Sequence, residues 1–396
     1  MINSELNLLQ PYPFEKLRTL LEGIEPSAQT PISLSVGEPK HPAPQFVLDA
    51  LTDSLKTLEQ YPSTRGSDEL RNSIAQWLRQ RFDLKKAGTL AEKHILPVNG
   101  TREGLFAIAQ CVLDRSKSAG SVLMPNPFYQ IYEGATLLAG CKPNFYTIDE
   151  NADANLASIS DKEFDDAQLI YICTPGNPTG AVNSMSALQA LIEKSQKHDF
   201  VIVSDECYSE IYRKESGAPC GLLQAAWAMG LETFDRCLVF HSLSKRSNLP
   251  GLRSGFVAGD ANLIKHFASY RTYQGCSMSG AVQSASTAAW SDEQHVTQNR
   301  AAYDEKYAAV VSILNTKLSV NTPPAGFYLW PELPTDDQTF TQRLLADQNV
   351  RAVPGSFLAR ATPDNAVNPG QNRLRLALVA PLDDCVQAAN RIIQCL

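Results

Sequence analysis

Five short apolar runs, separated by stretches long enough for helices, constrain the fold of this chain more than any other feature. They lie at residues 121–124, 168–173, 200–204, 237–241 and 255–258. Such an alternation of strands and helices predicts the α/β class, with a mainly parallel sheet that carries helices on both faces. Ligands of open α/β sheets bind beyond the carboxyl ends of the strands. We therefore look for function where these runs end.

The chain has 396 residues, which is long enough for two domains at the usual size of ~150 residues each. The polar, helix-prone stretch 292–317 predicts a connector that leaves the domain of the large sheet. Beyond it, residues 327–330 and 373–378 are predicted to be strands of a smaller α/β domain.

Composition excludes several function classes. The net charge is −7 with Lys and Arg scattered, so a nucleic-acid partner has no electrostatic support. The nine Cys include no CxxC pair and no Cys/His cluster with zinc spacing, so we expect no metal and a reducing, cytoplasmic location. The amino terminus lacks the basic region of a targeting signal, and no apolar run is long enough to cross a bilayer. We expect no membrane partner.

Lys245 follows the fourth apolar run in the segment HSLSK at 241–245, and Arg253 lies eight residues further on. A lysine amine condenses with the aldehyde of pyridoxal phosphate. The hydroxyls of Ser242 and Ser244 and the guanidinium of Arg253 can hold the phosphate of that cofactor. Taken alone, a Ser-rich loop that ends in Lys is equally typical of a solvated turn.

Two further runs end in polar residues. Asn177 lies in a Pro- and Gly-rich turn, which would hold its amide rigidly for a ring oxygen or a substrate carboxylate. Asp205 ends the third run, where a carboxylate can pair with a protonated pyridine nitrogen, and Tyr208 can hydrogen-bond the ring oxygen. Each has a plainer interpretation, as an ordinary turn for Asn177 and as a helix N-cap for Asp205.

Together these motifs, NPTG at 177–180, SDExY at 204–208 and SxSK at 242–245 with Arg253, resemble those of the class I pyridoxal-phosphate aminotransferases, the aspartate aminotransferase superfamily. The resemblance extends from residue 36 to Arg375. It implies the type I fold of that family, with a large cofactor-binding domain at 44–290 and a small domain built from 1–43 and 291–396. It also implies a homodimer.

The resemblance assigns roles to these residues. Lys245 would bind the cofactor covalently and then move the proton between the substrate α-carbon and the cofactor. Asp205 would hold the pyridinium, while Tyr208 and Asn177 would bind the phenolic oxygen.

The segment NGTR at 99–102 resembles the phosphate cup of the family. Gly100, Thr101 and Arg102 would begin a helix whose positive end faces the dianion. The cup would be completed by the side chains of Ser242, Ser244 and Arg253. Gly100 alone is also typical of a structural turn.

Two aromatic positions match the family pattern. The segment PNPFY at 125–129 resembles the loop that places a ring over the cofactor, and the offset from Pro127 favours Tyr129, with Phe128 as the alternative. Tyr61 resembles the tyrosine that reaches the phosphate of the neighbouring subunit. The plainer interpretation of that segment is a Pro-Gly turn before a helix.

Near the carboxyl terminus, Arg373 and Arg375 are predicted to share one face of a strand, because strand side chains repeat every two residues. The resemblance favours Arg375 as the fork for the substrate α-carboxylate, with Arg373 as a solvated residue. Gly37 would let the backbone approach that same carboxylate.

Substrate choice depends on a shorter segment. PYPFEKLR at 11–18 resembles the amino-terminal segment of the N-succinyl-L,L-diaminopimelate aminotransferases of lysine biosynthesis, which use glutamate as amino donor. This substrate carries carboxylates far from the reacting amine, so we expect further cations in the pocket. The candidates are Lys16, Arg18, Arg65 and Arg271, each of which is otherwise typical of a surface residue.

Three alternatives stay open at this point. One is another class I aminotransferase, acting on aspartate, alanine or aromatic amino acids. A second is a carbon-sulfur lyase on the same fold, because the same lysine chemistry can expel a β-substituent. The third is a regulator without activity, which an intact set of Lys245, Asp205, Asn177 and Arg253 argues against.

Overall fold

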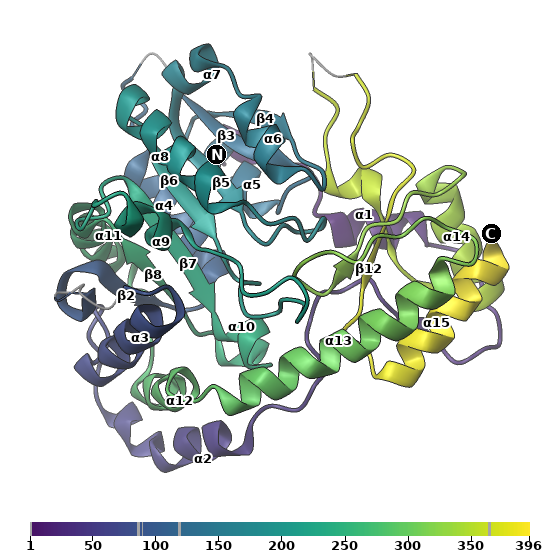
Figure 1. Cartoon of the computed structure of the whole chain (residues 1–396), viewed down its shortest axis with the longest axis horizontal. Coiled ribbons are helices and arrows are strands. Elements are labelled where there is room, and N and C mark those ends of the chain that lie inside the picture. The colour runs from purple at the N-terminus through teal and green to yellow at the C-terminus, as the bar shows by residue number, and fades with distance from the viewer. Residues whose placement is uncertain (1, 85–87, 89, 118–119, 363–365) are drawn as a thin grey trace.

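The computed structural model describes residues 2–84, 88, 90–117, 120–362 and 366–396, and its centre is a seven-stranded sheet (Figure 1). The strand order is β2-β8-β7-β6-β5-β3-β4. Strands β4, β3, β5, β6 and β7 run parallel, and β8 is antiparallel to both of its neighbours. The predicted α/β class with a mainly parallel sheet is confirmed. The strands are β2 (Ile95–Val98), β3 (Ser121–Asn126), β4 (Lys142–Thr147), β5 (Ala167–Cys173), β6 (Val201–Asp205), β7 (Cys237–Ser242) and β8 (Gly255–Gly259).

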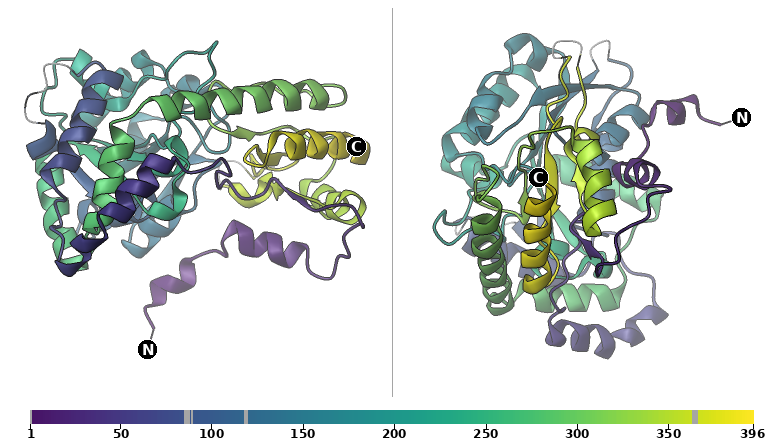
Figure 2. Two further views of the ribbon diagram at one scale, coloured as in Figure 1. Left: turned by 90° about the horizontal axis from the view of Figure 1, so that it is seen from below. Right: turned by 90° about the vertical axis from the view of Figure 1, so that its right-hand side faces the viewer.

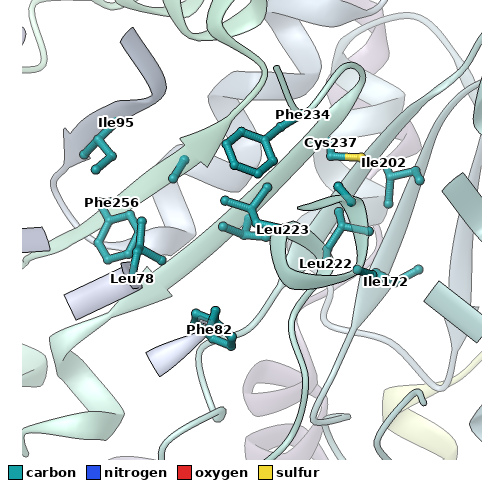
Figure 3. Close-up of a cluster of buried hydrophobic side chains, with 14 of the residues drawn as sticks. Leu78, Phe82, Ile95, Ile172, Ile202, Leu222, Leu223, Phe234, Cys237 and Phe256 are labelled. Atoms are coloured by element: carbon teal, nitrogen blue, oxygen red, sulfur yellow. The ribbon is translucent and has the colours of Figure 1, made fainter. Parts of the chain in front are cut away.

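Helices cover both faces of this sheet because successive side chains of its strands point to opposite faces. In β5, Ile170 and Ile172 join one buried cluster, whereas Leu169 and Tyr171 join the other. Figure 3 shows part of the first cluster, where Ile172 and Ile202 lie near Leu222. The first face is covered by α3 (Asp68–Arg81), α8 (Met185–His198), α9 (Leu222–Ala228) and α12 (Gly280–Trp290), and the second by α4 (Thr101–Val112), α5 (Ile131–Leu138) and α11 (Ala261–Gln274).

A second, smaller core is built from both ends of the chain. Ile32 in β1 (Ile32–Ser33) pairs with Val350 in β10 (Val350–Arg351). A three-stranded antiparallel sheet lies beside this pair, with β12 (Leu374–Ala377) between β11 (Val353–Pro354) and β9 (Tyr328–Leu329). The predicted small α/β unit from both chain ends is therefore present, while its exact bounds at 43 and 291 stay a prediction.

The long helix α13 (Gln294–Leu314) joins the two parts and packs on α15 (Leu382–Cys395), as Figure 1 shows. The amino-terminal segment, with η1 (Ser4–Leu8) and α1 (Pro13–Leu20), runs along one side of the molecule (Figure 2). The remaining helices are α2 (Gln45–Asp53), η2 (Leu55–Glu59), η3 (Leu90–His94), α6 (Ala152–Ala157), α7 (Asp161–Asp165), α10 (Leu243–Arg246), η4 (Pro250–Leu252), α14 (Asp337–Gln348) and η5 (Gly355–Leu358).

The described ranges contain no helix that is both long and apolar enough to span a bilayer. Nor do they contain a group of three or more His, Cys, Asp or Glu side chains that could hold a metal ion.

Candidate active site

Two hollows that share part of their lining lie beyond the carboxyl ends of β6 and β7. We call them the outer hollow, of about 570 Å³, and the inner hollow, of about 150 Å³. The outer one is lined by Ser242, Ser244 and Arg253, and the inner one by Asn177, Asp205 and Arg375. The residues that line both are Val36, Gly37, Thr101, Arg102, Tyr129, Cys207 and Lys245.

Lys245 is held at both ends of its side chain. Ser242 ends β7 and caps the short helix α10, where its Oγ accepts from the backbone N–H of Ser244 at 3.1 Å. The Nζ atom of Lys245 donates to the carbonyl oxygen of Gly37 at 2.5 Å. Burial, helped by the charges of Arg375 and Arg102, lowers the pKa of Lys245 from 10.5 to about 8. Near neutral pH a useful fraction of this amine is therefore uncharged and nucleophilic.

Asp205 is the last residue of β6 and is only 4% exposed. Its carboxylate accepts from the Tyr132 hydroxyl at 2.7 Å and from the Cys207 backbone N–H at 3.3 Å. Burial raises the pKa of Asp205 in spite of these hydrogen bonds. A buried carboxylate of this kind gains from a cationic partner, and the protonated nitrogen of a pyridine ring in the inner hollow would be one.

Arg375 carries its guanidinium into the inner hollow. Nη1 donates to Asn177 Oδ1 at 3.3 Å and Nη2 to the Ser35 carbonyl at 2.8 Å. Its Nε is buried and has no hydrogen-bond partner among the described residues. Its guanidinium lies 4.7 Å from the ring centroid of Tyr328, whose hydroxyl is 3.1 Å from that of Tyr208. This group can receive a carboxylate.

Arg373 takes a different course. It precedes β12, donates to the Trp330 carbonyl at 3.2 Å, and pairs with Glu332 at 3.5 Å near the surface. It lines another hollow, together with Pro331 and Thr147. Of the two arginines, Arg375 is the one that the fold brings to Lys245 and Asp205.

The outer hollow has the chemistry of a phosphate site. Gly100 has φ 87° and is the N-cap of α4, so backbone N–H groups of the first helical turn are free for an anion. A Cβ at Gly100 would lie 2.2 Å from Nη2 of Arg253, which leaves this position to glycine. The aliphatic hydroxyls of Thr101, Ser242 and Ser244 line the same hollow. These residues fit the phosphate of pyridoxal phosphate.

The two aromatic candidates near residue 128 have different environments. Phe128 is 1% exposed and packs on Phe145 with ring centroids 5.1 Å apart, so it belongs to the core. Tyr129 lines both hollows, and its hydroxyl accepts from Nε of Arg102 at 2.7 Å. Of the two rings, Tyr129 is therefore the one that the fold brings to the hollows, and its role over the cofactor stays a prediction. Tyr61, by contrast, is fully exposed on the loop before α3, away from both hollows.

The four cations expected near the distal carboxylates lie elsewhere. In the described chain none of Lys16, Arg18, Arg65 and Arg271 lines either hollow. Arg271 is 1% exposed and pairs with Glu103 at 2.5 Å, and Arg65 donates to the Glu92 carbonyl at 2.6 Å. These four candidates are therefore not at the described hollows, and which cations meet the distal carboxylates stays a prediction.

Some residues of the site were not predicted from sequence. Tyr12 and Phe14 of the amino-terminal segment line the inner hollow, as does Tyr328 of β9. A Cβ at Gly37 would lie 2.0 Å from the Tyr328 hydroxyl, so Gly37 and Tyr328 fit together closely. Tyr132 lies behind Asp205. No pattern in the sequence could show these contacts, because each joins segments that are distant in the chain.

Comparison with known proteins agrees with this geometry. The family model for aminotransferase class I and II matches residues 29–392. An aminotransferase of Neisseria meningitidis of known structure is 45% identical, with TM-score 0.93 and 99% of each chain covered. A second solved structure, an aminotransferase of Helicobacter pylori, is 34% identical, with TM-score 0.89 and 98% of each chain covered.

Among curated proteins, an LL-diaminopimelate aminotransferase of Maridesulfovibrio salexigens is 29% identical over 98% of this chain and 97% of its own length. A protein of the same name from Aquifex aeolicus is also 29% identical, over 98% of each. The chain belongs to the class I and II aminotransferases, enzymes that depend on pyridoxal phosphate.

Proposed function

We propose that this aminotransferase exchanges an amino group between glutamate and N-succinyl-L,L-diaminopimelate, with 2-oxoglutarate as the keto acid partner of glutamate. The observation that carries the proposal is the charge of the inner hollow. Lys245, Arg102 and Arg375 bring positive groups to it, while Asp205 is the only acid in its described lining. Such a lining favours a substrate with several carboxylates.

Within this proposal the residues divide into three groups. Lys245 moves the substrate proton, with Asp205 on the ring nitrogen and Tyr208 and Asn177 on the ring oxygen. The phosphate would be held by Gly100, Thr101, Arg102, Ser242, Ser244 and Arg253, and the Tyr129 ring would lie over the cofactor. The α-carboxylate is bound by Gly37, Asn177 and Arg375.

Bound pyridoxal phosphate supplies an aldehyde that bonds to amines and a cationic ring that accepts electrons from the substrate carbon. Lys245 must then take a proton from the α-carbon and return one at a different atom. A lysine whose pKa is lowered toward neutral by burial suits both transfers, because a general acid or base works best when its pKa lies near the operating pH. Arg375 keeps the α-carbon within reach of Nζ.

Succinylation changes the distal end of the substrate. Free diaminopimelate presents an ammonium beside its distal carboxylate, whereas the succinylated form has a neutral amide and an additional carboxylate there. The guanidinium of Arg102 lines both hollows and donates to the Tyr129 hydroxyl, with no acidic partner in the described chain. We propose that Arg102 binds a distal carboxylate of the substrate in addition to the cofactor phosphate. The relatives named LL-diaminopimelate aminotransferases support the diaminopimelate skeleton.

The test is a half-reaction comparison. We expect N-succinyl-L,L-diaminopimelate to react faster than L,L-diaminopimelate. With pyridoxal phosphate at saturating concentration, Arg102→Gln should lower kcat/KM for the succinylated substrate about tenfold, the value of one charge-assisted hydrogen bond, and should change it much less for alanine, which has no distal carboxylate. If free L,L-diaminopimelate reacted faster, the substrate of this enzyme would instead be the one in the name of its relatives, L,L-diaminopimelate. If glutamate transferred its amino group only to oxaloacetate, the keto acid of aspartate, or to aromatic keto acids, the diaminopimelate proposal would be overturned.

We further propose a cytoplasmic homodimer in which Tyr61 reaches the cofactor phosphate of the neighbouring subunit. Tyr61 is fully exposed, and so in large part are Leu55 and Leu58 just before it. An apolar cluster of this kind suits a subunit interface. Arg253, which lines the outer hollow, is exposed. A side chain of a partner subunit can therefore reach a phosphate bound beside it.

A further inference from the structure

A buried amide lies beneath the helix that carries Lys245. Asn299 belongs to α13 and is 5% exposed. Its Nδ2 donates to the carbonyl oxygens of Lys245 at 3.2 Å and Arg246 at 3.3 Å. The last carbonyls of a helix have no partner within it, and α10 ends at Arg246. Because those atoms only accept, the amide of Asn299 can face them only with its NH₂ group.

The other side of this amide is fixed by His41. Asn299 Oδ1 lies 2.7 Å from His41 Nδ1, and His41 Nε2 lies 2.7 Å from Nζ of Lys306. The amide oxygen only accepts and the ammonium only donates, so His41 is neutral with its hydrogen on Nδ1. Every donor in the series points the same way, from Lys306 through His41 and Asn299 to the Lys245 carbonyl.

This series also reaches the far end of the Lys245 side chain. His41 lies four residues after Gly37, whose carbonyl accepts from Lys245 Nζ at 2.5 Å. Asn299 thus binds the backbone of Lys245 directly, and through His41 it holds the segment that receives the amine. Lys306 donates in addition to the Val379 carbonyl at 3.4 Å, just beyond the strand of Arg375.

We propose that Asn299 is a positioning residue for Lys245 and that His41 orients its amide. In the described chain neither residue lines the outer or the inner hollow, so their effect on the reaction is indirect, through the backbone of Lys245 and the segment that carries Gly37. The inference rests on the proposed role of Lys245 as the group that moves the substrate proton.

Other contacts keep α10 in place when Asn299 is changed. The Arg246 guanidinium donates to the carbonyls of Ala289 at 2.7 Å and Asp292 at 3.0 Å. His295 Nε2 lies 2.8 Å from the Ser247 hydroxyl. Loss of Asn299 should therefore leave the fold intact and loosen chiefly Lys245.

The experiment uses the holoenzyme with four variants, Asn299→Leu, His41→Leu, His41→Asn and Gln298→Leu. His41→Asn keeps a donor close to the place of Nδ1. Gln298, the neighbour of Asn299 on α13, is exposed and serves as the matched control. Each protein is reacted with glutamate and with glutamate deuterated at the α-carbon, in single-turnover and steady-state measurements.

For Asn299→Leu we expect kcat to fall about tenfold to a hundredfold, as for a small displacement of a reacting group. KM for glutamate should stay within about twofold, and the deuterium isotope effect should rise because proton transfer becomes slower. His41→Leu should behave alike, His41→Asn should recover most of the loss, and Gln298→Leu should match the wild type.

A second measurement uses the apoprotein. Lys245 is trapped with pyridoxal and borohydride across pH and quantified by peptide mass spectrometry. The midpoint, which is the pH at which trapping of Lys245 is half-maximal, should be about 8 in the wild type. It should be higher in Asn299→Leu, because the amine leaves its buried position. The groups that face Lys245 are unchanged in this variant, and they are Cys207, Glu38, Arg102 and Arg375. The midpoint therefore reports the position of the amine.

The inference is overturned if Asn299→Leu and His41→Leu keep the isotope effect and kcat of the wild type. It is also overturned if His41→Asn is as impaired as His41→Leu. Should Asn299→Leu fail to fold, the two His41 variants decide the question alone. Failure of the proposed function looks different, because then the wild type shows no isotope effect or Lys245→Ala remains active.

Discussion

At the scale of the residue, the central fact is the burial of the Lys245 amine. Burial disfavours the charged ammonium and lowers the pKa of Lys245 from 10.5 to about 8. The uncharged amine, which attacks the cofactor aldehyde, therefore predominates above about pH 8. We expect the rate of cofactor attachment to apoprotein to rise with pH and level off just above pH 8, measured by stopped-flow absorbance. A rate that keeps rising to pH 10 would contradict this environment.

Arg375 tests the carboxylate side of the site. Arg375→Lys keeps the charge but loses the planar fork, and with it at least one of two parallel hydrogen bonds. Because such bonds are worth roughly 1.5 to 3 kcal/mol, kcat/KM should fall on the order of tenfold to a hundredfold for glutamate and the diaminopimelate substrate alike. Arg373→Lys is the matched control. A harmless Arg375→Lys beside a crippled Arg373→Lys would reverse the choice between them.

Residues whose chemistry is carried by a local motif could be predicted from sequence. Lys245, Asp205 and Asn177 each lie at or just after the end of a strand in a short recognisable segment, and the fold brings all three to one pocket. Their supporting partners could not be predicted, as with Tyr132 behind Asp205, because such a contact depends on how separate elements pack.

At the scale of the element, the turn between β2 and α4 depends on Gly100. Its positive φ disfavours any other residue, and a Cβ there would collide with the Arg253 guanidinium in its present position. Gly100→Ala should displace the guanidinium and weaken binding of pyridoxal phosphate by about tenfold or more, since strain and a lost charge-assisted bond add up. Equilibrium binding to apoprotein measures this. Gly251→Ala, at an open position in the same hollow, should bind as the wild type does.

If Gly100→Ala and Gly251→Ala weakened the binding of pyridoxal phosphate equally, the turn at Gly100 would have no special role.

Strands β3 and β5 to β8 were predicted because they are buried on both faces and therefore apolar throughout. The two edge strands, β2 and β4, were not among the predicted runs. The residues of β4 are mostly part-exposed and its sequence, KPNFYT, carries no apolar run, while β2 has only four residues, one of them Pro97. The parallel pairing of β1 with β10, which joins the two ends of the chain, involves only two residues from each strand. That is too few to show a strand pattern in the sequence.

At the scale of the whole molecule, the proposed homodimer gives the exposed Tyr61 a role at the site of the neighbouring subunit. Heterodimers of Lys245→Ala with Tyr61→Ala should regain about half of the wild-type activity per dimer. One of their two sites would combine an intact Lys245 with an intact Tyr61 from the other chain. Co-expression with two tags isolates the heterodimer, and each variant homodimer is the control. Activity no higher than that of Tyr61→Ala alone would place the role of Tyr61 within its own subunit.

The account as a whole depends on amino-group transfer through Lys245, and a single turnover tests it most directly. Holoenzyme mixed with glutamate and no acceptor should release about one equivalent of 2-oxoglutarate per protomer and no ammonia. Lys245→Ala, which keeps Asp205 and the phosphate cup, should still bind pyridoxal phosphate and release almost none. Release of ammonia instead, or a substantial rate of 2-oxoglutarate formation by Lys245→Ala, would contradict the account.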